Sequence, residues 1–114
     1  MAIQIKRAYE TPSKEDGARI LIDGLWPRGV TKEKAEIAEW MNEIAVSAPL
    51  RKWFSHDPAK WPEFRKRYRA ELARKPGAVA RLRALARKGT LTIVYGAKDE
   101  AHNNAVVLKE FLEK

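Results

Sequence analysis

The 114-residue chain contains no cysteine. This excludes disulfides, thiolate nucleophiles and metal sites built on thiolates, and the chain needs no oxidising compartment. No apolar run approaches the roughly 18 residues that a membrane-spanning helix requires. The N-terminus also lacks the basic and then apolar pattern of a signal peptide. We therefore expect a cytoplasmic protein that does not associate with membranes.

Repeats, low-complexity tracts and glycine–serine linkers are absent as well, so the chain is expected to form one domain over residues 1–114. Hydrophobic residues make up 45% of the sequence, which is enough for a packed core. Charge is unbalanced: 23 basic residues against 15 acidic ones give a formal net charge of +8. A surface this basic attracts polyanions and speeds the encounter with anionic ligands.

The hydrophobic periodicity predicts apolar strands that alternate with amphipathic helices. This alternation indicates a single-domain α/β layered sandwich, with a mostly parallel small sheet flanked by helices. Residues 36–46 fit either a helix or a strand. The strands are expected at residues 2–9, 18–23 and 90–95, and helices at 32–35, 50–54, 58–74 and 99–113. Pro76-Gly77 is expected to break the chain, and Val79, Leu82, Leu85 and Ala86 mark a further helix that ends at Gly89.

The first candidate site lies where the apolar run 18–23 ends in Asp23 and a Trp26-Pro27-Arg28-Gly29 turn follows. Residues just beyond a buried strand are where α/β proteins bind ligands. The rigid fork of donors on Arg28 suits a phosphate or carboxylate. The alternative is structural: Trp26 fills the core, Arg28 pairs with an acid such as Asp23 or Asp99, and Asp23 caps a neighbouring turn.

The second candidate site follows the last strand, which ends at Tyr95. A short turn and then a helix would present free backbone amides to an anion, and Lys98 would add a positive charge. Asp99 is expected to cap this helix, with His102 about one turn inside it and Asn103 beside it. The turn lacks the full glycine patterns of nucleotide-binding loops, so the sequence identifies no cofactor.

His56 precedes a helix start and could reach the same cleft, although a histidine in such a turn usually bonds the local backbone. With Asp23 and His102 it could compose a metal site, but metal binding needs three or more convergent ligands. The spacing does not show that convergence, so no metal is assigned.

Three segments resemble the YeaO-like branch of the family known as domain of unknown function 488. The resemblance covers nearly the whole chain and implies an α/β domain with no settled biochemical activity. The segments are Asp23-Gly24-Leu25-Trp26-Pro27-Arg28-Gly29, Arg51-Lys52-Trp53-Phe54-Ser55-His56-Asp57-Pro58 and Tyr95-Gly96-Ala97-Lys98-Asp99-Glu100-Ala101-His102-Asn103.

Two positions depart from that family pattern. Similar proteins usually carry arginine after Asp23, where this chain has Gly24, so a guanidinium role there is absent or supplied by Arg28 or Arg19. The position after Asn103 is often histidine and is Asn104 here, which removes one imidazole from any metal site.

Parallel strands would bring both candidate sites to one edge of the sheet. We therefore expect a cleft for a small anionic ligand, phosphorylated or nucleotide-like. If the cleft is catalytic, hydrolysis or group transfer is the expected class. The expected site residues are Asp23 and His102 for acid–base chemistry, and Trp26, Arg28, Tyr95, Lys98, Asp99 and Asn103 for ligand binding.

The alternative function is a nucleic-acid-associated binding module without catalysis. Two predicted helices carry many basic residues, although the aromatic residues among them are spaced for a core rather than for stacking on bases. The sequence contains no recognised DNA- or RNA-binding signature. The basic residues are Lys60, Arg65, Lys66, Arg67, Arg69, Arg74, Arg81, Arg83, Arg87 and Lys88.

Overall fold

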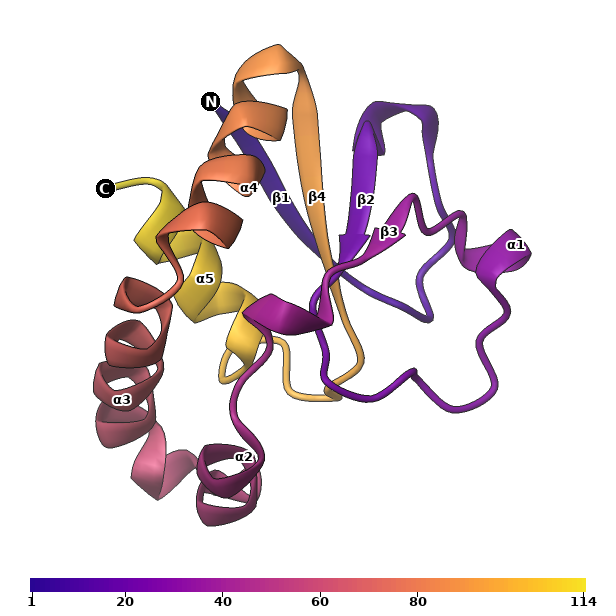
Figure 1. The fold of residues 1–114 in the computed structure, drawn as a ribbon. Helices are drawn as coiled ribbons and strands as arrows, with labels where there is room; N and C mark the ends of the chain where they lie inside the picture. Colours follow the sequence, from indigo (N-terminus) through magenta and orange to yellow (C-terminus); the bar gives the residue numbers. More distant parts are fainter.

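A computed structural model describes residues 1–114 and contains one four-stranded sheet in the order β1-β4-β2-β3 (Figure 1). Every neighbouring pair of strands runs parallel, which confirms the predicted α/β class. The strands are β1 (Ala2–Arg7), β2 (Ala18–Leu21), β3 (Glu39–Trp40) and β4 (Thr90–Tyr95).

The helices lie mainly on one side of the sheet, with α3, α4 and α5 grouped there and the short α1 on the opposite side (Figure 1). The α-helices are α1 (Lys32–Ala35), α2 (Ala48–Phe54), α3 (Trp61–Ala73), α4 (Pro76–Lys88) and α5 (Asn104–Leu112). Single 3-10 turns are η1 (Lys14–Asp16), η2 (Asn42–Ile44) and η3 (Pro58–Lys60).

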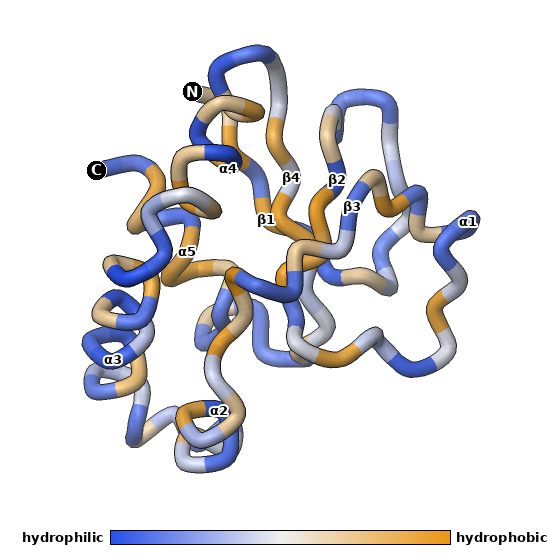
Figure 2. Tube along the Cα trace, viewed as in Figure 1, coloured by the Kyte–Doolittle hydropathy of each residue, from blue (hydrophilic) through white to orange (hydrophobic).

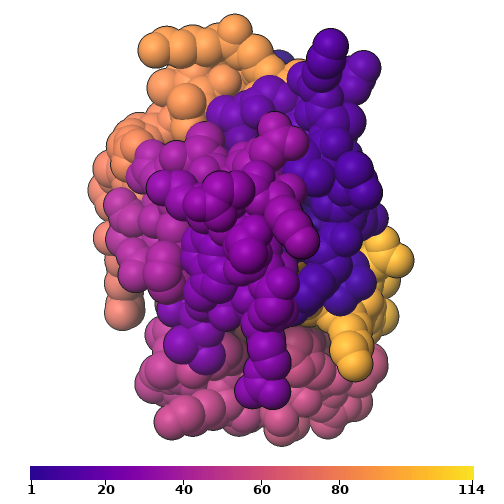
Figure 3. All heavy atoms as spheres, turned by 90° about the vertical axis from the view of Figure 1, so that its right-hand side faces the viewer, coloured from indigo at the N-terminus to yellow at the C-terminus, as the bar shows by residue number.

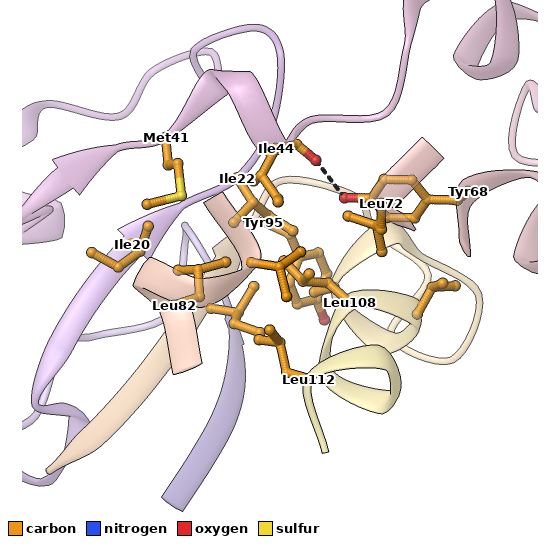
Figure 4. Packing of buried hydrophobic residues seen from close by; sticks show 14 of the residues in the cluster. Ile20, Ile22, Met41, Ile44, Tyr68, Leu72, Leu82, Tyr95, Leu108 and Leu112 are labelled. Carbon is orange, nitrogen blue, oxygen red and sulfur yellow. Dashed lines mark hydrogen bonds between the residues drawn. The ribbon is translucent and has the colours of Figure 1, made fainter. Parts of the chain in front are cut away.

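The main core lies between the sheet and helices α3, α4 and α5. Leu91 and Ile93 of β4 belong to this cluster, together with Leu82 of α4 and Leu108 of α5. Figure 4 shows Leu82 and Leu108 among the buried side chains. The hydroxyl of Tyr68 on α3 donates a 2.8 Å hydrogen bond to the carbonyl of Ile44, so this buried phenol has a partner. Hydrophobic residues are correspondingly concentrated along the strands and α5 (Figure 2).

The opposite face of the sheet has a smaller core, in which Leu21 and Val94 pack against Ala35 and Ile37. The segment between β2 and β3 supplies most of this cover, and it lies at the centre of the face seen in Figure 3. Burial on both faces explains why the carboxyl ends of the central strands, Ile20–Leu21 and Ile93–Tyr95, are apolar without alternation.

The ambiguous stretch 36–46 is neither one helix nor one full strand. Glu36 adopts a left-handed conformation, with a φ of 49°, and ends α1. The chain then pairs with β2 over only two residues of β3 before η2 begins. The predicted helix 58–74 begins as the 3-10 turn η3, with the Asp57 side chain accepting the amide of Ala59, and continues as α3.

The start of the last helix differs from the sequence expectation. Helix α5 begins at Asn104 rather than at Asp99, and its N-cap is Asn103, whose side chain accepts the amide of Val106 at 3.0 Å. Asp99 instead accepts the amides of Ala101 and His102 in a non-helical turn. His102 therefore lies before the helix and not one turn inside it.

Candidate functional site

A cavity of about 300 Å³ opens at the carboxyl edge of the sheet. The loops that follow β1, β2 and β4 line one part of it, and residues from α2, α3 and the turn after α2 line the rest. The lining residues are Tyr9, Asp23, Gly24, Leu25, Trp26, Pro27, Val46, Arg51, Phe54, His56, Phe64, Gly96, Ala97, His102, Asn103 and Asn104.

Asp23 joins the two candidate sites that the sequence had placed separately. Its two carboxylate oxygens accept the amide of Gly96 at 2.9 Å and the side-chain amide of Asn104 at 2.8 Å. A Cβ on Gly96 would lie 3.0 Å from the Asp23 carboxylate, so a glycine at this position allows the close approach. The structural alternative considered for Asp23, in which it caps a neighbouring turn, describes these contacts.

The charge of Asp23 is disfavoured by its surroundings. Burial raises the pKa of Asp23, and the hydrogen bonds from Asn104 and Gly96 and the charges of His56 and Arg51 offset only part of the rise. Asp23 is the only carboxylate among the lining residues. Arg51 and His56 therefore share the cavity with one carboxylate, that of Asp23.

Arg51 supplies the guanidinium beside Gly24. A Cβ built on Gly24 would lie 3.5 Å from Arg51 Nη1, so the arginine side chain of α2 lies against Gly24. The guanidinium of Arg51 has no hydrogen-bond or ion-pair partner in the structure. Neither of the two substitutes expected from the sequence takes this place: Arg19 is buried against Asp16, 2.7 Å away, and Arg28 does not line the cavity.

His56 reaches the cavity because the chain turns sharply after α2. Ser55 and His56 both adopt left-handed conformations, with φ values of 47° and 57°. Beside this turn, the ring of Phe54 stacks on Phe64 with centroids 4.2 Å apart and forms an apolar wall. The sequence named His56 as a residue that could reach the cleft, and the cavity lining includes it.

His102 is held by Asp99. Its Nδ1 lies 2.9 Å from Asp99 Oδ2, and its ring meets the edge of Trp61 at 5.2 Å between centroids. Hydrogen bonds from the amide of Ala101 and from the side chain of His102 lower the pKa of Asp99. The ionised carboxylate accepts only, so Nδ1 of His102 carries a proton in this contact.

The structure separates the predicted site residues into two groups. Asp23, Trp26, His102 and Asn103 line the cavity, whereas Arg28, Tyr95, Lys98 and Asp99 do not. Arg28 and Lys98 are exposed, and Tyr95 is buried in the main core. Asp99 contacts two lining residues, His102 through its carboxylate and Asn103 through its carbonyl, which accepts the side-chain amide at 2.9 Å.

Sequence reasoning gave no role to Arg51, Tyr9, Leu25, Phe54 or Phe64. The available signal for Leu25, Arg51 and Phe54 was their place in segments shared with similar proteins. No such segment contains Tyr9 or Phe64, which join the cavity through tertiary packing.

Neither a metal-ion site nor a membrane-spanning helix is present in the structure. No group of three or more histidine, aspartate or glutamate side chains is placed to hold a metal ion. No helix has the length and apolar character needed to cross a membrane.

Comparison with known proteins places the chain among relatives of similar length. It is 43% identical over 112 residues to the uncharacterized protein YeaO of Escherichia coli K12, which covers 98% of this chain and 97% of YeaO. It is 34% identical over 110 residues to the uncharacterized protein Rv3073c of Mycobacterium tuberculosis, which covers 96% of this chain and 92% of that protein. No solved structure matches the chain. Residues 2–114 match the family described as the inactive DUF488-N3 subclade, and the chain belongs to that family.

Proposed function

We propose that this protein binds a small phosphate-bearing ligand in the cavity at the carboxyl edge of the sheet and does not transform it. The observation that carries the proposal is the unpaired guanidinium of Arg51 at the cavity. Arginine presents a fork of donors that matches phosphate geometry, and an arginine without an internal partner is free to use it. His56 and His102 add two imidazoles from separate loops.

Several features favour binding over catalysis. The cavity lining contains no serine, threonine, cysteine or lysine, so the nucleophile types present are limited to Asp23, His56, His102 and Tyr9. Asp23, the expected acid–base residue, is already engaged by Gly96 and Asn104. The description of the family as inactive points in the same direction. Hydrolysis or group transfer by Asp23 and His102 is the competing proposal, and turnover of a phosphate ester by the purified protein would favour it.

Calorimetric titration with inorganic phosphate and ribose 5-phosphate tests the proposal. Replacing Arg51 with alanine removes a charge-assisted hydrogen bond, so affinity should fall by roughly 10- to 100-fold. Arg28→Ala is the matched control, because Arg28 is an exposed arginine that does not line the cavity. Equal losses in the two variants, or no binding of either phosphate by the unaltered protein, would count against the site.

The basic helices do not carry a second proposal, because many of their charges are already used inside the molecule. Arg65 and Arg69 both reach Glu110, Arg67 pairs with Glu63, and Arg81 bonds Glu39. The nucleic-acid-binding alternative would be favoured if the protein bound to immobilised nucleic acid and charge reversal at Arg65, Arg69 and Arg81 abolished that binding. Such binding would also weaken steeply with salt.

A further inference from the structure

The mouth of the cavity is unusually apolar for an exposed surface. Four large hydrophobic side chains stand out as exposed in this protein: Met1, Tyr9, Leu25 and Trp40. Two of them, Tyr9 at 50% and Leu25 at 66% exposure, line the same cavity. Exposed apolar groups that gather at one cleft mark a ligand or partner site.

Tyr9 is also held in place, although it is half exposed. Its hydroxyl donates a 3.0 Å hydrogen bond to the carbonyl of Arg28. The guanidinium of Arg7 lies 5.0 Å from the centre of the Tyr9 ring, and Arg7 is itself fixed by a 2.8 Å hydrogen bond to the carbonyl of Ala97. A ring fixed in this way loses little conformational freedom when a ligand packs on it.

The apolar and cationic parts of the cavity come from different elements. Tyr9 follows β1 and Leu25 follows β2, whereas Arg51 belongs to α2 and His56 to the turn after it. A phosphate ion alone would use the cationic part and leave Tyr9 and Leu25 exposed. The volume of about 300 Å³ is within the range of small-molecule sites.

We propose that the ligand is a phosphate monoester that carries a planar aromatic group, as a nucleoside monophosphate does. The phosphate contacts Arg51, and the aromatic ring packs against Tyr9 and Leu25 at the mouth. This inference rests on the proposed phosphate-binding function and adds the aromatic group of the ligand. Stacking of a base on an aromatic side chain is the interaction that would select it.

Three probes separate the contributions in calorimetric titrations: AMP, ribose 5-phosphate and adenosine. AMP should bind at least tenfold more tightly than ribose 5-phosphate, since it adds the base alone. Tyr9→Ala and Leu25→Ser should each reduce the ratio of the affinity for AMP to that for ribose 5-phosphate. The affinity for ribose 5-phosphate itself should stay unchanged. Tyr9→Phe keeps the ring and loses only the hydroxyl, so it should preserve the preference for AMP.

The outcomes distinguish the two proposals. Equal affinities for AMP and ribose 5-phosphate, unaffected by Tyr9→Ala, would overturn this inference and leave phosphate binding standing. Adenosine binding as tightly as AMP, with no affinity for ribose 5-phosphate, would overturn both. Binding of none of the three would also overturn both.

Discussion

Single residues fix the entry into β2, and Gly17 is the clearest case. Its φ of 62° lies in the left-handed region, and a Cβ there would be 2.2 Å from the carbonyl oxygen of Thr90 at the start of β4. Only glycine fits both the backbone conformation and the close approach.

Gly17→Ala should therefore lower the free energy of unfolding by about 3 kcal/mol or more, as steric overlap adds to backbone strain. Urea denaturation measures the loss. Gly77→Ala is the control, because nothing lies within 4 Å of a Cβ there and the residue is inside α4. It should stabilise by about 0.5–1 kcal/mol. A loss of less than about 1 kcal/mol in Gly17→Ala would show that β4 can move aside.

Residue identity predicted part of the candidate site. Asp23 and Trp26 line the cavity because they follow a central strand, and a strand end is readable from the apolar pattern. Arg28 follows the same strand, but its side chain does not reach the cavity, where Arg51 of α2 supplies the guanidinium. The choice between them depends on how α2 packs against the loop after β2, which no local pattern contains.

Among the elements, α5 shows why its start was predicted at the wrong residue from the sequence. Asp99 and Asn103 are both good N-cap residues, so the sequence offers two starts. One carboxylate oxygen of Asp99 accepts hydrogen bonds from the amides of Ala101 and His102, in a turn that precedes the helix. Asn103 is extended, with a φ of −143°, and caps the helix. With this turn before the helix, His102 and Asn104 both line the cavity.

Asn103→Ala should cost about 1 kcal/mol of stability, since the amide of Val106 loses its acceptor. Hydrogen exchange gives the sharper measurement: the Val106 amide should exchange faster in this variant. In Asp99→Ala the Ala101 and His102 amides should exchange faster and that of Val106 should stay protected. Faster exchange at Val106 in Asp99→Ala would instead place the cap at Asp99.

The short strand β3 is an element that hydrophobic periodicity could not predict. Its pairing with β2 involves only two register positions, Ile20 with Glu39 and Leu21 with Trp40. So short a strand has no alternation of its own to detect. Its position is set by β2 and by the side chain of Trp40, which donates a 2.6 Å hydrogen bond to the carbonyl of Asp23.

For the whole molecule, a buried charge cluster links stability to pH. Asp16 is almost fully buried and is contacted by Lys6 at 2.8 Å and Arg19 at 2.7 Å. Burial alone raises the pKa of Asp16, but hydrogen bonds from Lys6, the Ser13 backbone and Arg19 outweigh it and lower the pKa from 3.8 to about 2.

A carboxyl whose pKa is lowered on folding stabilises the protein above its unfolded pKa, and this contribution is lost as the pH falls through the folded value. Stability should therefore drop as the pH falls from about 4 to 2. Denaturant midpoints measured across this range test the trend. NMR titration of the side-chain carboxyls of the unaltered protein should show Asp16 still ionised at pH 3. Titration of Asp16 at or above 3.8 would contradict the assignment.

The sequence by itself determined the α/β class, the central strands, the main helices and the edge of the sheet at which the candidate site is proposed. These features depend on local periodicity and on the rule that parallel strands end together. Tertiary structure decided which side chains meet there. Asp23 joins Gly96 and Asn104, and Arg51 lies against Gly24. Asp23 and Gly96 meet because β2 and β4 are neighbours in the sheet. The packing of α5 and α2 brings Asn104 and Arg51 to the same edge from distant parts of the chain, and such contacts leave no local pattern in the sequence.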